Sequence, residues 1–182
     1  RFLFSHASAN VRLIEIVLKV LNLYFCTMKY RVLTMEELEV FSEDFKHFLI
    51  INGVHHEEWV EMNESKKEQA NQLVMLFSDT VLQKVYEKIE FLEHRTEKSC
   101  MVFNINKKES RLISLTLKNE SSESLSTPES IHSALQKGSK DISIFKTNKG
   151  FGEDRELEVH KLIEQGCVPS DKLFWKSLEK LL

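Results

Sequence analysis

The longest stretch of helical hydrophobic spacing in the chain lies between Ser65 and Arg95. Its apolar positions recur every three or four residues, at Leu73, Val74, Phe77, Val81, Val85 and Ile89. At about 100° per residue they form an arc roughly 160° wide, more than a single packed stripe needs. Ser65 and Glu68 have the spacing of a capping box. The pattern predicts a long central helix that begins at Ser65, ends near residues 88–90 and has neighbours on two sides.

A second helical pattern precedes the central helix. Thr34 and Glu37 have capping-box spacing, and Gly53 suits the left-handed position that ends a helix. The apolar face between them consists of Leu38, Phe41, Phe45, Phe48 and Leu49. We therefore expect one helix from Thr34 to Gly53, followed by a short helix around Glu57–Met62.

Alternating apolar and polar residues replace the helical spacing after residue 90. Phe91–Arg95, Cys100–Ile105 and Arg111–Leu117 alternate in this way, with a turn at Lys107–Ser110. Ile142–Phe145 is a short apolar stretch that fits a fourth strand. This pattern is typical of an antiparallel meander.

Helix signals return on both sides of the fourth strand. Pro128 follows Thr127 as the first residue of a helix, and Gly138 marks its end. A helix at Glu153–Gln165 is closed by Gly166, and a last one at Asp171–Leu182 follows Pro169, with Ser170 as its cap. The predicted fold class is α+β: N-terminal helices with one long central helix, an antiparallel three- to four-stranded sheet, and a C-terminal helical hairpin at residues 153–182.

The first residues differ in kind from the rest. Residues 1–34 carry five basic side chains and one acidic, whereas the whole chain has a net charge of −3. The apolar stretch Leu13–Cys26 is too short and too charged to span a bilayer, and no signal-peptide cleavage site follows it. We expect residues 1–27 to be a non-native or upstream leader that is helical where it is ordered, and residues 28–182 to be a single α+β domain that starts at Met28.

The composition limits which classes of partner and which cellular compartment fit the protein. Cys26, Cys100 and Cys167 lie far apart, which argues against a zinc site or a disulfide framework and fits a reducing compartment. The slightly negative net charge does not suggest nucleic-acid binding. No cofactor is expected, since phosphate-loop, metalloprotease and hydrolase motifs are lacking. No membrane partner is expected either, because the apolar stretch Leu13–Cys26 is too short and too charged to span a bilayer.

His55 and His56, followed by Glu57 and Glu58, have the residue types of a metal site. Adjacent residues on a helix point about 100° apart, so the two histidines cannot easily share one ion. Acidic residues at a helix start are explained by the helix dipole alone. We therefore predict no metal.

Glu93, His94 and Arg95, with Glu90 nearby, form the densest charged cluster beside the predicted core. In a strand, Glu93 and Arg95 share one face and His94 points to the other. An enzyme could use His94 as a general acid or base and Arg95 to hold an anionic substrate. A polar sheet edge with ordinary ion pairs is the simpler reading.

Lys149, Gly150 and Gly152 lead into a helix, and Lys146 and Arg155 lie close by in sequence. Helix N-termini bind phosphate, so these residues are weak candidates for an anion site. Glu153 and Asp154 occupy the first turn, however, and would repel an anion.

The last helix has an apolar arc roughly 200° wide, about twice the width of one packing face. Either the helix is buried on both sides or part of its surface contacts a partner. Trp is enriched at binding hot spots. We expect Trp175 and Leu182 to lie at the outer edge and to meet a protein partner or a second copy of the chain.

Three stretches together resemble a family of small uncharacterised proteins from Bacteroidetes such as flavobacteria. They run from Met28–Thr34 through Asn52-Gly53, from Phe77–Asp79 through Leu92–Arg95, and from Arg155–Glu158 through Leu162–Gly166. The resemblance covers residues 28–182 and implies a bacterial, cytoplasmic protein. That family has no known function, so it assigns no catalytic residues. The sequence favours a non-catalytic interaction or regulatory module over a small enzyme that acts on a phosphate-bearing substrate.

Overall fold

The computed structural model describes residues 28–118, 121–136 and 140–181. Its contacts divide the chain into two compact units, Arg1–Leu82 and Gln83–Leu182. The expectation of a single domain over residues 28–182 stays a prediction. The predicted leader, the helix end at Gly138 and Leu182 lie outside the described residues.

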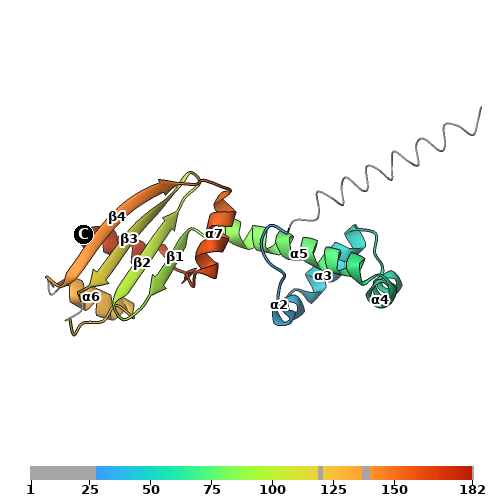
Figure 1. Ribbon diagram of the computed structural model, residues 1–182, viewed down its shortest axis with the longest axis horizontal. Coiled ribbons are helices and arrows are strands. Elements are labelled where there is room, and N and C mark those ends of the chain that lie inside the picture. The colour runs from blue at the N-terminus through green and yellow to red at the C-terminus, as the bar shows by residue number, and fades with distance from the viewer. Residues whose placement is uncertain (1–27, 119–120, 137–139, 182) are drawn as a thin grey trace, which may run out of the picture. The chain divides into compact units, whose positions relative to one another are not determined.

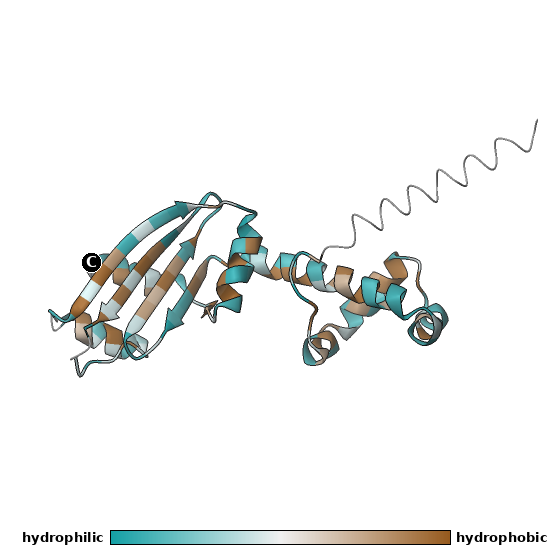
Figure 2. Cartoon of the chain, in the orientation of Figure 1, coloured by the Kyte–Doolittle hydropathy of each residue, from teal (hydrophilic) through white to brown (hydrophobic). Residues whose placement is uncertain are grey.

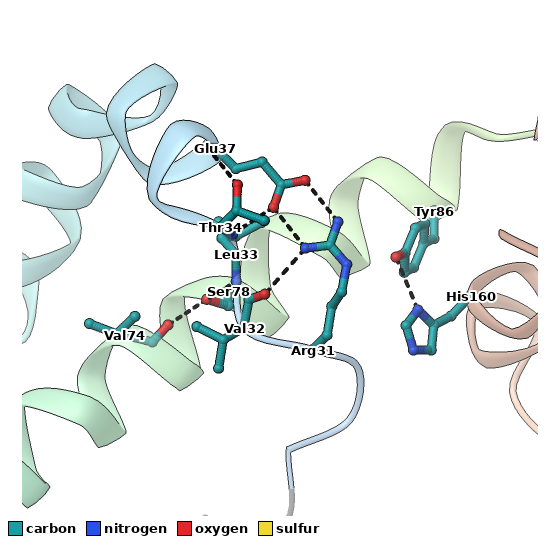
Figure 3. Close-up of polar contacts among 9 residues, drawn as sticks. All are labelled: Arg31, Val32, Leu33, Thr34, Glu37, Val74, Ser78, Tyr86 and His160. Carbon is teal, nitrogen blue, oxygen red and sulfur yellow. Dashed lines mark hydrogen bonds and ion pairs between the residues drawn. The ribbon is translucent and has the colours of Figure 1, made fainter. Parts of the chain in front are cut away.

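The described part of the first unit is helical. It contains α2 (Met35–Val40), α3 (Ser42–Ile51), α4 (His56–Ser65) and most of α5 (Lys67–Lys88). The capping box at the start of α2 is confirmed, since the Thr34 side chain accepts from the Glu37 N–H and the Glu37 carboxylate accepts from the Thr34 N–H. Arg31 holds the same carboxylate through both of its terminal nitrogens, at 2.7 Å each (Figure 3).

Two helix boundaries differ from those predicted. The single helix from Thr34 to Gly53 is interrupted at Phe41, which separates α2 from α3. Ser65 does not cap the central helix. It is the last residue of α4, and its hydroxyl donates back to the Glu61 carbonyl. Glu61 is four residues earlier, so this serine bonds within its own helix instead of beginning the next one.

Aromatic packing forms the core of the first unit. Phe77 is 3% exposed, as its place in the middle of the apolar stripe predicted. Its ring lies 4.9 Å from Phe45 and 5.3 Å from Phe48, and Phe45 also meets Trp59 edge-on. The polar side of α5 holds the incoming chain, because Asp79 accepts from the backbone N–H groups of residues 29 and 30, and Ser78 from that of Leu33.

The second unit contains an antiparallel five-stranded sheet (Figure 1). Its strands are β1 (Phe91–Arg95), β2 (Ser99–Ile105), β3 (Glu109–Leu117), β4 (Ile142–Gly150) and β5 (Val168–Pro169). They lie in the order β4-β3-β2-β1-β5. The predicted meander is confirmed. The predicted strand count was too low, because β5 is only two residues long and contains a proline.

Besides the end of α5, the described part of this unit contains the helices α6 (Pro128–Gln136), α7 (Arg155–Glu164) and α8 (Lys172–Leu181). Buried side chains of β2 and β3 pack with those of α6 and α8 in one core, which includes Val102, Leu115, Ile131, Trp175 and Leu178. We call this side of the sheet the α6/α8 face. The opposite side, the α7 face, carries Phe103, Leu112 and Thr147, which line a pocket with residues of α7.

The predicted C-terminal hairpin of helices is wrong. α7 and α8 serve opposite faces of the sheet, and β5 lies between them in sequence and pairs with β1. No helix among the described residues is both long and apolar enough to cross a membrane.

Candidate functional site

Glu93 and Arg95 form an ion pair on the α6/α8 face, in which the carboxylate is buried and the guanidinium is partly exposed. The Glu93 residue is 6% exposed and its carboxylate is bonded to the Arg95 guanidinium. The Ser170 hydroxyl donates to the second carboxylate oxygen at 2.7 Å. The Arg95 guanidinium also stacks over the Phe174 ring, 5.2 Å from its centroid. Both carboxylate oxygens therefore have partners, and the cluster links β1 to the segment after β5 and to α8.

The ion pair lies near a buried thiol. Burial raises the pKa of Cys100 to about 12, with the Arg95 charge lowering it and the Glu93 charge raising it further. Cys100 is directly opposite Arg95 in the β1–β2 register. A nucleophilic cysteine needs a depressed pKa, so this thiol has the properties of a core residue.

His94 lies on the α7 face, away from Glu93 and Arg95, as strand alternation predicted. Its ring packs against Gly166, where a Cβ would lie 3.5 Å from the imidazole Cδ2. Gly166 has φ +91°, so it also satisfies the backbone conformation that closes α7. The His94 Nδ1 is buried and has no hydrogen-bond partner among the described residues. A general base must reach a substrate proton, so this nitrogen, which is closed to solvent, cannot act as one.

The Arg155 guanidinium joins three elements of the second unit. It donates to the carbonyls of Tyr86 and Asn106 at 3.0 and 3.1 Å and also to that of Ile89. It is ion-paired with Glu156 as well. The carbonyls of Tyr86 and Ile89 belong to the end of α5, where helix carbonyls lack partners within the helix. Arg155 therefore acts as a side-chain cap of α5, and its nitrogen atoms have protein partners instead of an anion.

A second contact joins the same helices. The Tyr86 hydroxyl is 3.1 Å from the His160 Nδ1 on α7 (Figure 3). Tyr86 is 2% exposed, so this bond satisfies a buried hydroxyl. Together with Arg155, it fixes α7 against the end of α5.

Two of the remaining anion-site candidates lie in a strand and not in a loop that leads into a helix. Lys149 and Gly150 belong to β4, which extends to Gly150 instead of ending at Phe145. Gly152 lies in the connection to α7 and Gly150 pairs with Glu109. Lys149 and Gly150 line a pocket of about 310 Å³, the sheet–α7 pocket, whose other walls include Phe103, Leu112 and Leu162. None of its lining residues comes from β1, so His94 and Arg95 do not meet Lys149 there.

His55 caps α4, with its backbone N–H donating to the Glu58 carboxylate at 2.9 Å. Glu57 and Glu58 lie in the first turn of this helix, as the helix-dipole argument expected. Over the described ranges, no three His, Cys, Asp or Glu side chains gather in a way that could hold a metal ion.

The predicted position of Trp175 is corrected. It is 3% exposed, packs near Phe91 and lies under the Arg111 guanidinium. On the same helix Leu173 is 80% exposed, so the buried side of α8 is centred on Trp175 and Leu178. The error arose because the sequence gives the width of the apolar arc on the helix but does not show which part of that arc packs against the rest of the protein. Partner binding by Trp175 and Leu182 stays a prediction, and Leu182 lies outside the described residues.

The most exposed apolar strand is β4, at one edge of the sheet. Ile144 is 45% exposed and Phe145 is 59% exposed. Figure 2 shows hydrophobic residues near the start of β4 and mostly hydrophilic ones towards its end. No described strand pairs with its outer side.

The register shows which backbone groups point outward from β4. The Lys118 N–H donates to the Asp141 carbonyl, and hydrogen-bonded pairs alternate along an antiparallel ladder. The residues bonded to β3 are therefore Ser143, Phe145, Thr147 and Lys149. The residues whose N–H and C=O groups point outward are Ile142, Ile144, Lys146, Asn148 and Gly150.

The opposite edge of the sheet is closed in a different way. β5 is two residues long, and Pro169 pairs with Leu92. The neighbouring residue Ser170 donates its N–H to the Phe91 carbonyl, so Pro169 lies at a non-hydrogen-bonded position. A short strand with a proline protects an edge from further pairing. β4 has neither feature.

A family described as "Family of unknown function (DUF6495)" matches residues 28–182. The chain belongs to this family. The DUF6495 match begins at Met28, where the resemblance in the sequence also begins, and it confirms an uncharacterised family over that range. Comparisons with curated proteins and with solved structures gave no match. The Bacteroidetes origin stays a prediction.

Proposed function

We propose that this DUF6495 protein is a non-catalytic interaction module, and that it binds an extended segment of a partner protein along the outer edge of β4. An extended segment can add a strand to an exposed sheet edge, with main-chain hydrogen bonds supplying affinity. The observation that carries the proposal is the nine-residue β4, whose outward N–H and C=O groups face no described strand.

Two further features support β4 as the binding edge. Exposed Ile144 and Phe145 would gain burial from an added strand. The other edge is blunted by Pro169, so among the described strands β4 is the one whose outer side is open for pairing. We place the module in the cytoplasm of a bacterium, in line with the resemblance and the cysteine content.

The alternative of a small enzyme has less support. It needs His94, Arg95 and the region from Lys146 to Arg155 to act together. His94 and Arg95 point to opposite faces, and Arg155 is bonded to backbone carbonyls.

The test uses two substitutions at one position. Ile144→Pro removes an outward N–H without removing a bond to β3, whereas Ile144→Thr keeps the N–H and a β-branched side chain. Both variants and the wild type are used to capture partners from extracts of the source cells. We expect a protein that is recovered with the wild type and with Ile144→Thr and lost with Ile144→Pro. Equal recovery with a folded Ile144→Pro variant would contradict binding along this edge.

A further inference from the structure

We infer that the segment bound along β4 alternates acidic and bulky apolar side chains, with the acidic ones on the α6/α8 face and the apolar ones on the α7 face. This inference rests on the proposed function and states which kinds of side chain the bound segment carries. Side chains of an added strand point alternately to the two faces of the sheet. What each face offers beside β4 therefore determines which side chains fit.

Two pockets flank the second half of β4 on opposite faces. The sheet–α7 pocket reaches β4 at Thr147 and Lys149. A second pocket of about 260 Å³, the sheet–α8 pocket, reaches β4 at Lys146, Thr147 and Asn148 and is also lined by Arg111, Trp175 and Glu179. An added strand would lie about 5 Å from β4, so its long side chains can reach into both pockets. Pockets for alternate side chains are what gives specificity in this mode of binding.

The sheet–α7 pocket is suited to an apolar side chain. Its floor contains Phe103, Ile105 and Leu112 from the sheet, and Leu162 covers it from α7. A leucine, methionine or phenylalanine entering from the β4 side would remove this apolar surface from water. Phe145, which points to the same face, would be covered by the neighbouring apolar residue of the segment.

The sheet–α8 pocket is suited to an acidic side chain. Arg111 is already ion-paired with Glu179 at 2.8 Å and stacks on Trp175. Lys146 is exposed and has no ion-pair partner among the described residues. A carboxylate opposite Lys146 would supply one.

The charge of β4 also argues against a second copy of the chain as the occupant. Residues 142–150 contain two lysines and no acidic residue. Antiparallel self-pairing centred on Lys146 would place this lysine directly opposite Lys146 of the second copy, which is destabilising. Lysines on an edge strand are a known protection against self-association. The same lysines would attract an acidic segment, so they favour an acidic partner over a second copy of the chain.

The geometry also sets the order of residues in the segment. In antiparallel addition, the residues opposite Lys146 and Asn148 form hydrogen-bonded pairs and point to the α6/α8 face, while those opposite Phe145 and Thr147 point to the α7 face. The segment is therefore acidic at alternate positions and apolar between them.

The test uses three capped, fluorescein-labelled peptides as long as β4, and fluorescence anisotropy at low ionic strength. The first alternates glutamate with leucine, and the second alternates lysine with leucine. The third has the composition of the first with its glutamates and leucines in separate blocks. They are titrated with the wild type, Lys146→Glu, Ile144→Pro and Ile144→Thr.

We expect the alternating glutamate peptide to bind the wild type at least about fivefold more tightly than either of the others. Lys146→Glu should weaken this peptide about fivefold and should strengthen the alternating lysine peptide. Ile144→Pro should reduce binding about tenfold or more, whereas Ile144→Thr should stay close to the wild type.

The outcomes separate the two proposals. Equal binding of the acidic and basic alternating peptides, lost with Ile144→Pro, would overturn the acidic preference and leave β4 as a binding edge. Binding of the acidic peptide that is unchanged by Ile144→Pro would place its site elsewhere and contradict both. The absence of binding by all three peptides would also contradict both.

Discussion

β3 and β4 are neighbours in one sheet and differ sharply in burial. Both are nine residues long and are paired along their whole length. β3 has strands on both sides and contributes Ile113, Leu115 and Leu117 to the core. β4 has a strand on one side, and all its residues from Ser143 to Gly150 are exposed. The alternation in β3 and the apolar stretch in β4 therefore predict that strands form, but not which strand is central and which lies at an edge.

This difference in burial gives the core under the central strands and the edge at β4 different roles. The core under β2 and β3 is closed by Trp175 and Leu178 of α8 and supports stability. The edge at β4 combines outward backbone groups with exposed apolar and basic side chains, which is what binding requires. Substitutions in the first region should change folding, and substitutions in the second should change association.

The largest effect is expected from Trp175→Ala. It removes a buried aromatic side chain from the core beneath the sheet, and such deletions reduce the free energy of unfolding by about 3–5 kcal/mol. Urea denaturation followed by circular dichroism measures this change. A loss below about 1 kcal/mol, together with weaker association, would instead return Trp175 to the partner-contacting role expected from the sequence.

Cys100 tests the closed side of the sheet chemically. Burial raises its pKa from 9.0 to about 12, so at pH 8 the folded protein holds about a thousandfold less thiolate at this position than the unfolded chain. Alkylation by iodoacetamide should be correspondingly slow until urea is added. Comparable rates with and without urea would show that the face is open.

The same shift has a defined sign for stability. A thiol with a raised folded-state pKa is protonated in both states well below pH 9, so its ionisation does not make stability depend on pH there. Between pH 9 and about pH 12 only the unfolded chain loses the proton, and stability therefore falls as the pH rises. When the free energy of unfolding of each protein is compared with its value at pH 7, the Cys100→Ala variant should lose less stability at alkaline pH than the wild type.

A pair of proline substitutions in β4 distinguishes its inner and outer edges. Thr147→Pro removes an N–H that points toward Leu112 on β3, whereas Ile144→Pro removes one that points outward. Thr147→Pro should therefore lower the free energy of unfolding by about 1–3 kcal/mol more than Ile144→Pro. Equal losses in thermal or urea unfolding would mean that the hydrogen-bond alternation is assigned to the wrong residues.

The smallest effect on folding is expected from Phe145→Ser. Its ring is 59% exposed, and surface substitutions usually change stability by no more than about 0.5 kcal/mol. Binding of the alternating glutamate peptide should weaken, because the ring would be covered by the added strand. A loss of stability like that of Trp175→Ala would show that β4 belongs to the core.

Local signals predicted much of the fold. The limits of β1, the end of α5 and the turn between β2 and β3 follow from periodicity and turn residues close together in sequence. The capping box at Thr34 and the positive φ of Gly53 and Gly166 are likewise local. Phe77 was predicted to be buried because it lies in the middle of the stripe.

Long-range contacts could not be predicted in this way. Ser170 donates to Glu93 across 77 positions in sequence, while Asp171 accepts from the Phe174 N–H at the start of α8, where Ser170 was expected to do so. Arg155 bonds to carbonyls of α5 and of the β2–β3 turn, although its sequence position suggested an anion site. The edge position of β4 depends on the strand order, which no local pattern contains.

Hydrogen exchange of the β4 amides, measured by NMR, tests the free edge most directly. In the free protein the amides of Phe145 and Thr147 should exchange slowly, and those of Ile144, Lys146 and Asn148 should exchange rapidly. Saturation with the alternating glutamate peptide should slow the three rapid amides and leave the two protected ones slow. Uniform protection in the free protein, or rapid amides unchanged at saturation, would contradict strand addition at β4.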